Sequence, residues 1–126
     1  IEAKRLPTPV YSGSQETEYV CYKNSTKQGG IERFKTNKHG NKLPISLMVG
    51  YLQLENSNYW CNKVNEWITE QIIKSSNESI SWINEDMLSK DLTFEDDAII
   101  TKYTSEHLRS NSEKIKLHHY WIDLVN

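Results

Sequence analysis

The chain has 126 residues, of which 37% are hydrophobic and 25% are charged, with a formal net charge of −2. Four Trp and seven Tyr are too many for a disordered chain, and the length suits one domain that buries about two-thirds of its unfolded surface. No apolar run approaches the ~18 residues of a membrane span and no signal peptide is visible, so we expect a cytoplasmic protein without a membrane partner. Cys21 and Cys61 are too few for a disulfide framework, and their apolar neighbours favour buried free thiols.

The charges are distributed unevenly along the chain. Residues 1–44 contain eight Lys or Arg and four acidic residues, whereas residues 45–100 contain three basic and ten acidic residues. The net charge is therefore +4 in the first segment and −7 in the second. A basic segment can face phosphates, but a solvated charged surface explains the same pattern equally well.

The first elements expected along the chain are a short strand and two short helices. Ile1–Arg5 reads as a strand, and the prolines that follow it cannot continue a central ladder. Gln15–Tyr22 is compatible with a helix. Within Gly29–Gly40, Ile31 and Phe34 are spaced so that one short helix can bury both. The basic residues of this helix are expected to stay solvated: Arg33, Lys35 and Lys38.

The middle of the chain carries the clearest periodic signals. The mostly apolar run Ile45–Leu54 suits a central strand covered on both faces. After the possible N-caps at Asn56–Asn58, apolar residues at i, i+4, i+7, i+8 and i+12 predict an amphipathic helix. This spacing favours a core-facing stripe over a base-stacking platform. The stripe consists of Trp60, Val64, Trp67, Ile68 and Ile72.

The last part of the chain predicts an antiparallel pair of strands. A short element is expected at Ser81–Asn84, and the acidic residues 95–97 mark a loop. Asp97–Thr104 and Ile115–Val125 read as strands, with Ser105–Glu113 as their polar connection. The order is strand, helix, strand, helix and β-hairpin, which indicates an α/β sheet with an antiparallel addition.

Most familiar catalytic patterns are weak here. His118 and His119 are adjacent, so on a strand they face opposite ways and cannot bind one ion from the same face. Ser105-Glu106-His107 contains the residue types of a catalytic triad, but neighbours in sequence seldom form one. Glu95-Asp96-Asp97 lacks the spacing of a calcium-binding loop, and the chain has no glycine-rich phosphate loop.

Glu2 and Lys4 are a stronger candidate, because alternate residues of a strand point to the same face. Such a pair can be a surface salt bridge, worth under about 1 kcal/mol, or half of a metal site. Its place in a basic segment, followed by a short helix and an apolar strand, favours the functional interpretation.

Several motifs carry a resemblance to a known superfamily. They are IEAKRL (1–6), EYV (18–20), GGIERFKTNKHG (29–40), LMVGYLQ (47–53), the helix with Trp60 and Lys63–Ile68, YTSEHLRS (103–110) and IKLHHYWIDL (115–124). In order and spacing they resemble the C-terminal part of a PD-(D/E)XK, or restriction-endonuclease-like, nuclease domain. Within that superfamily the likeness is to bacterial proteins associated with restriction and phage defence. The resemblance covers most of the chain.

The resemblance implies a restriction-endonuclease-like α/β core, with residues 1–126 as the C-terminal portion of one larger domain whose N-terminal part is missing. It implies DNA cleavage with Mg²⁺ or Mn²⁺. Glu2 would be a metal ligand, the Ala3 carbonyl an auxiliary ligand and Lys4 the catalytic ammonium. The residues expected to contact DNA phosphates are Arg33, Lys35, Lys38, His39 and Arg109.

The sequence departs from the family in one ligand. The superfamily places an Asp before the Glu-x-Lys element, whereas the first Asp of this chain is Asp86. The chain also starts at Ile1 without an initiator Met, which suggests a trimmed or processed form. We therefore expect this chain alone to bind Mg²⁺ poorly and not to cleave DNA, with a preceding segment or a partner chain completing the fold, and a homodimer as a further option.

The alternative is a non-catalytic domain of the same fold. In that case Glu2 and Lys4 form a structural ion pair, and the basic helix binds nucleic acid or a partner protein.

Overall fold

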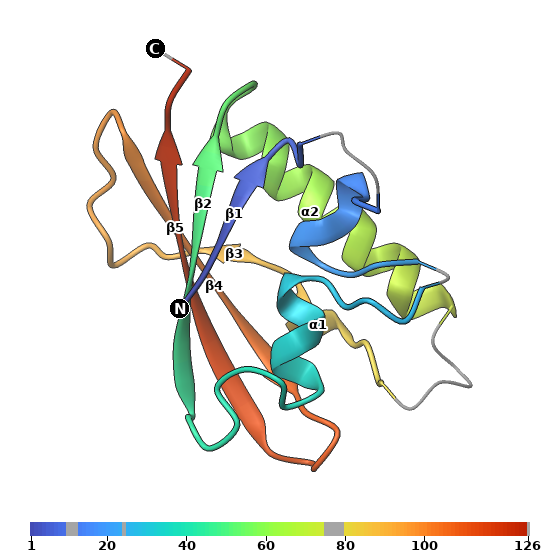
Figure 1. Ribbon diagram of the computed structural model, residues 1–126. Coiled ribbons are helices and arrows are strands. Elements are labelled where there is room, and N and C mark those ends of the chain that lie inside the picture. The colour runs from blue at the N-terminus through green and yellow to red at the C-terminus, as the bar shows by residue number, and fades with distance from the viewer. Residues whose placement is uncertain (10–12, 24, 75–79, 126) are drawn as a thin grey trace.

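The computed structural model describes residues 1–9, 13–23, 25–74 and 80–125 (Figure 1). Within these ranges, five strands form one mixed sheet in the order β1-β2-β5-β4-β3. The strands are β1 (Glu2–Leu6), β2 (Ile45–Leu52), β3 (Ser89–Lys90), β4 (Ile100–Leu108) and β5 (Lys114–Asp123). The helices are α1 (Gly30–Lys35) and α2 (Ser57–Lys74), with short 3-10 helices η1 (Glu16–Tyr19) and η3 (Asn84–Asp86). The predicted α/β class is confirmed.

The sheet is parallel on one side and antiparallel on the other. β1, β2 and β5 are parallel neighbours, and β4 runs antiparallel to both β5 and β3. The predicted strand–helix–strand–helix order followed by a β-hairpin is therefore present. The hairpin was predicted with the wrong bounds, because the β4–β5 ladder continues to the pair Leu108–Lys114 and leaves only residues 109–113 as the connection.

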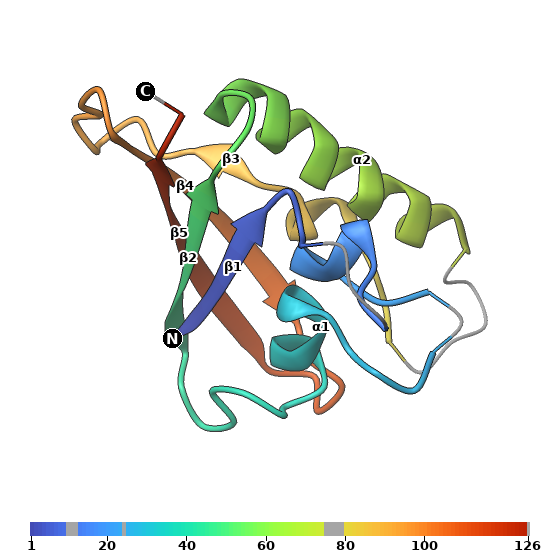
Figure 2. The same ribbon diagram turned by 45° about the horizontal axis from the view of Figure 1, so that its top comes forward.

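Both helices lie on the same face of the sheet, together with η1 (Figures 1 and 2). The strands show this arrangement as an alternation of burial: in β2, Met48 and Leu52 are buried, whereas Leu47, Val49 and Tyr51 are half-exposed. The expectation that β2 is covered on both faces was wrong for the described part of the chain. The physical reason is that the apolar run fits a strand with one buried and one half-exposed face as well as a fully buried one.

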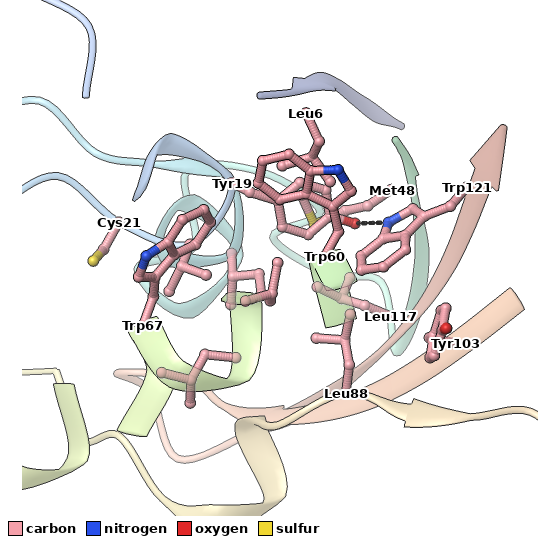
Figure 3. Close-up of a cluster of buried hydrophobic side chains, with 14 of the residues drawn as sticks. Leu6, Tyr19, Cys21, Met48, Trp60, Trp67, Leu88, Tyr103, Leu117 and Trp121 are labelled. Atoms are coloured by element: carbon pink, nitrogen blue, oxygen red, sulfur yellow. Dashed lines mark hydrogen bonds between the residues drawn. The ribbon is translucent and has the colours of Figure 1, made fainter. Parts of the chain in front are cut away.

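The hydrophobic core lies between the covered face of the sheet and the helices (Figure 3). In α2, Trp60, Val64, Trp67 and Ile68 are buried, so the predicted core stripe is confirmed. Ile72 is partly buried and packs against the same core.

The segment before α1 is less regular than predicted. The helix expected over residues 15–22 is only the four-residue turn η1. Both cysteines are free thiols, as predicted, with Cys21 buried and Cys61 half-buried. Burial raises the pKa of the Cys21 thiol to about 12, so it is protonated at neutral pH. In the described ranges, no helix combines the length and apolar composition needed to cross a membrane.

Candidate functional site

Glu2 and Lys4 lie side by side on β1, at the margin of the sheet (Figure 2). The Lys4 Nζ atom is 3.2 Å from Glu2 Oε1, and both side chains are about one-tenth exposed. Ala3 and Arg5 alternate with them and are exposed. The predicted common face of Glu2 and Lys4 is confirmed. Among the described residues β1 pairs with β2 alone, so the other edge of β1 is open to a further strand.

Two of the predicted phosphate-binding residues converge on Glu2. Arg33, in α1, donates a hydrogen bond from NH1 to Glu2 Oε1 at 3.3 Å. His39, after α1, places Nε2 2.7 Å from Glu2 Oε2. Both carboxylate oxygens of Glu2 therefore face basic groups. We call Glu2, Lys4, Glu18, Arg33 and His39 the marginal cluster.

Glu18 is the member that the sequence did not single out. Its Oε1 lies 3.8 Å from Lys4 Nζ and accepts a 2.6 Å hydrogen bond from the Tyr22 hydroxyl. In the sequence it is the first residue of the EYV motif, and no spacing rule predicts that a residue of this turn lies next to Lys4. The turn that carries Glu18 packs closely on the segment before α1, since a Cβ on Gly29 would lie 2.6 Å from the backbone oxygen of Glu18.

Two surface hollows flank the marginal cluster. One, of about 500 Å³, is lined by Lys4, Arg5 and Glu18 together with Tyr51 from the open face of the sheet. The other, of about 390 Å³, is also bordered by Glu18 and carries three cationic side chains. These are Lys27, Arg33 and Lys38. Lys38 and Arg33 thus stand where they can meet an anion, and Lys27 joins them without having been predicted.

Lys35 and Arg109 occupy different positions from those predicted. Lys35 is fully buried and forms a 2.8 Å ion pair with Asp86. Arg109 is 3% exposed and donates hydrogen bonds to backbone carbonyls of residues 40, 41 and 43. The solvation expected for Lys35 was wrong, and neither side chain has surface left for a phosphate contact. Both hold the segment around α1 in place instead.

The metal ligands that β1 offers do not make a complete magnesium site. In the part of the chain that is described, no three His, Cys, Asp or Glu side chains gather closely enough to hold a metal ion. Glu2 and the Ala3 carbonyl could supply two oxygen ligands, and water or a substrate would have to fill the other four positions of a near-octahedral Mg²⁺ site. Asp86 cannot supply another, because it is buried with Lys35.

A second polar cluster lies in the core, where β4 and β5 place alternate residues on the covered face of the sheet. Asp86 Oδ1 lies 2.6 Å from His107 Nδ1. His107 Nε2 lies 2.6 Å from the Ser105 hydroxyl, which is also 2.7 Å from His119 Nε2.

The same series continues toward η1. His119 Nδ1 lies 2.7 Å from the Tyr19 hydroxyl, and Trp121 Nε1 donates to that hydroxyl at 2.9 Å (Figure 3). We call the whole series the buried chain. Its members are Asp86, His107, Ser105, His119, Tyr19 and Trp121.

The buried chain corrects the interpretation of Ser105-Glu106-His107. Ser105 and His107 do share a hydrogen bond, and the acid beyond them is Asp86 rather than Glu106. However, Ser105 is 4% exposed and its hydroxyl lies between two imidazoles, so it does not face a substrate. The prediction that His118 and His119 face opposite ways is confirmed, with His119 fully buried and His118 half-exposed.

Burial decides the protonation of this cluster. Desolvation lowers the pKa of His107, and it lowers the pKa of His119 well below its usual value, so both rings are neutral at neutral pH. Burial alone would raise the pKa of Asp86, but the hydrogen bond from His107 and the charge of Lys35 lower it overall. Asp86 is therefore an anion paired with the Lys35 ammonium.

Comparison of the chain with protein-family models, with curated proteins and with solved structures finds no match.

Proposed function

We propose that the marginal cluster is one half of a metal-dependent endonuclease site of the restriction-endonuclease-like kind, acting on DNA. The observation that carries the proposal is the joint position of Glu2 and Lys4, which lie 3.2 Å apart on a strand with an open edge. The expected setting is a cytoplasmic restriction or phage-defence system of a bacterium.

The second half of this site is an acidic residue from outside the 126 residues. A strand that pairs with the open edge of β1 would bring its side chains next to Glu2, because residues opposite each other on paired strands lie about 5 Å apart. A preceding segment or another chain could provide that strand. The chain alone is then expected to be inactive, since Glu2 is the one carboxylate that β1 offers to the metal.

Each basic residue of the site has a separate role in this proposal. The Lys4 ammonium would orient the attacking water and offset the charge that develops on the scissile phosphate. Arg33 and Lys38, which line the cationic hollow with Lys27, would hold neighbouring phosphates of the DNA strand. His39 and Glu18 would set the positions of Glu2 and Lys4.

A non-catalytic domain that binds nucleic acid remains the second candidate, because one observation favours it. Both Glu2 oxygens already face basic groups: Lys4 and Arg33 at Oε1, and His39 at Oε2. In this alternative the cations fix Glu2 as a structural anion, and only the cationic hollow contacts the ligand.

Paramagnetic Mn²⁺ separates the two candidates on the chain as it stands. At millimolar Mn²⁺, the half-site should broaden the amide NMR signals of Glu2 to Lys4, and Glu2→Gln should remove the effect. Glu95→Gln, in the exposed acidic loop, is the matched control and should leave the broadening at β1 unchanged. Broadening that is absent from β1, or that persists in Glu2→Gln, would favour the non-catalytic domain.

A further inference from the structure

The buried chain has a single direction of proton donation, which follows from the chemistry of its ends. Asp86 is an anion that can only accept, so His107 must carry its proton on Nδ1. A neutral His107 then accepts at Nε2, and the Ser105 hydroxyl must donate to it. Because Ser105 has only one proton, His119 must donate to Ser105 from Nε2.

The rest of the buried chain follows in the same way. A neutral His119 with its proton on Nε2 accepts at Nδ1, so Tyr19 donates to it. The Tyr19 oxygen then accepts from Trp121, whose indole N–H can only donate. Each hydrogen bond of the buried chain then has one donor and one acceptor. A second proton on either imidazole would point a donor at a hydroxyl that already donates, and it would add a buried charge.

The two ends of the buried chain join the elements that carry the marginal cluster. Tyr19 is the last residue of η1, and its neighbour Glu18 contacts Lys4. At the other end, Asp86 pairs with Lys35 of α1, the helix that also carries Arg33. The buried chain therefore fastens both η1 and α1 to the sheet next to β1.

We propose that the buried chain is an acid-sensitive latch, which holds η1 and α1 on the sheet while both imidazoles are neutral. A proton on either imidazole would release η1 and α1, and would thereby move Glu18 and Arg33 away from Lys4 and Glu2. This inference depends on the geometry of the marginal cluster and not on what the cluster does.

The charged and titratable groups around the latch fit this role. His107 faces Asp86 and, beyond it, Lys35 of α1, while Glu106 flanks it on its own strand. Desolvation lowers the pKa of His107 and outweighs the Asp86 carboxylate, which raises it, while the Lys35 ammonium lowers it further.

Among the described residues, no carboxylate that would stabilise a proton contributes to the surroundings of His119. They are the Tyr19 hydroxyl, the Ser105 hydroxyl and the neighbouring imidazoles of His107 and His118. His118 lies on the open face, near Lys102 and Lys116.

Imidazole NMR tests the direction of the buried chain. In ¹H–¹⁵N spectra of the full chain at pH 7.5, His107 should be the neutral Nδ1–H tautomer and His119 the neutral Nε2–H tautomer. The opposite tautomer at either ring, or a charged ring, would overturn the proposal.

The pH dependence of unfolding tests the latch. The unfolded chain takes up a proton at each of these histidines below about pH 6.5, whereas the folded chain does so only at lower pH, because burial lowers the pKa of both rings. The unfolded state therefore binds more protons, and each histidine should raise the unfolding equilibrium constant by up to about tenfold per pH unit as the pH falls below that value.

The variants should separate a latch from a merely structural contact. His119→Gln should remove one proton from this pH dependence, whereas His118→Gln, the adjacent control on the open face, should retain most of it. In the wild type, acid should remove the Trp121 indole N–H protection and change the Glu2 and Lys4 amide signals over the same pH range. In Tyr19→Phe, which keeps the His119 ring but removes its hydroxyl donor, the change of these amide signals should shift toward neutral pH. If the amide signals of Glu2 and Lys4 do not change together with that indole signal, or if His119→Gln retains the wild-type slope, the proposal is wrong.

Discussion

The marginal cluster and the buried chain are built by the same local rule, yet they differ in almost every physical property. Each uses alternate residues of a strand whose side chains face the helices: Glu2 and Lys4 on β1, and Ser105 and His107 on β4. β1 is an edge strand, so its pair stays partly exposed and charged. On β4, Ser105 and His107 lie beyond the short ladder with β3, and they are buried under the segment that carries Asp86, so each of their protons needs an acceptor. The cover that other segments provide over the strand, rather than the strand order, therefore decides whether a polar pair can exchange its partner for a ligand.

The balance of charge shows the same contrast. The buried chain contains one anion and meets one cation, Lys35, so it is neutral as a whole. In the marginal cluster, Glu2 and Glu18 face Lys4, Arg33 and the imidazole of His39. The contacts described for the marginal cluster are mostly ion pairs rather than a series in which each donor has one acceptor, and its cationic groups lie near the surface. We expect changes in the buried chain to alter stability and changes in the marginal cluster to alter binding.

The largest expected effect is on the buried ion pair. Asp86→Asn leaves the Lys35 ammonium buried without its anion, and it should lower the free energy of unfolding by about 3–5 kcal/mol. Denaturant unfolding at pH 7.5 measures this loss. Asp96→Asn, which breaks the exposed pair with Lys90, is the control and should cost far less. Equal losses in the two variants would remove the contrast between buried and exposed charges.

A smaller loss is expected from Tyr19→Phe. The substitution preserves the ring but leaves the Trp121 indole N–H and His119 Nδ1 without a partner, at a cost of about 1–3 kcal/mol in unfolding free energy. Tyr51→Phe, on the half-exposed face of β2, should change stability by less than about 0.5 kcal/mol. A Tyr19→Phe variant as stable as the wild type would show that the buried chain adds nothing to the fold.

The smallest change in stability is expected at the marginal cluster. Lys4→Met removes the pair with Glu2 but also relieves repulsion from Arg33, so the unfolding free energy should change by less than about 1 kcal/mol. The same variant should weaken binding of a short DNA duplex more than Lys42→Met does, since Lys42 is exposed and away from both hollows. A loss of several kcal/mol would identify Glu2 and Lys4 as a structural ion pair.

Much of the fold could be predicted from periodicity. The alternation on β1 placed Glu2 and Lys4 together, the helical stripe located α2, and the polar break before Ile115 located the hairpin. These features depend on neighbours within about ten residues. The prediction of a strand covered on both faces failed, because an apolar run does not show on which side the helices pack.

The misplaced site residues share a different cause. Lys35 has the spacing of a solvated helix residue, and its burial follows from a partner 51 residues away, Asp86. Arg109 likewise bonds carbonyls of the loop before β2, 66 to 69 positions away. The link from Tyr19 to His119 spans 100 positions. Only the folded topology brings such groups together, so a spacing rule could not predict the buried chain.

DNA cleavage is the decisive measurement for the proposal that Glu2 and Lys4 are half of a nuclease site. The protein would be assayed with Mg²⁺ in a form that also carries an Asp-bearing strand able to pair with β1, supplied by preceding residues or by a partner chain. We expect this form to cleave DNA, with cleavage abolished by Lys4→Ala and unchanged by Lys42→Ala. Cleavage that persists in Lys4→Ala would show that Lys4 is not part of such a site. A completed sheet that binds DNA but does not cleave it would show that Glu2 and Lys4 are not half of a nuclease site.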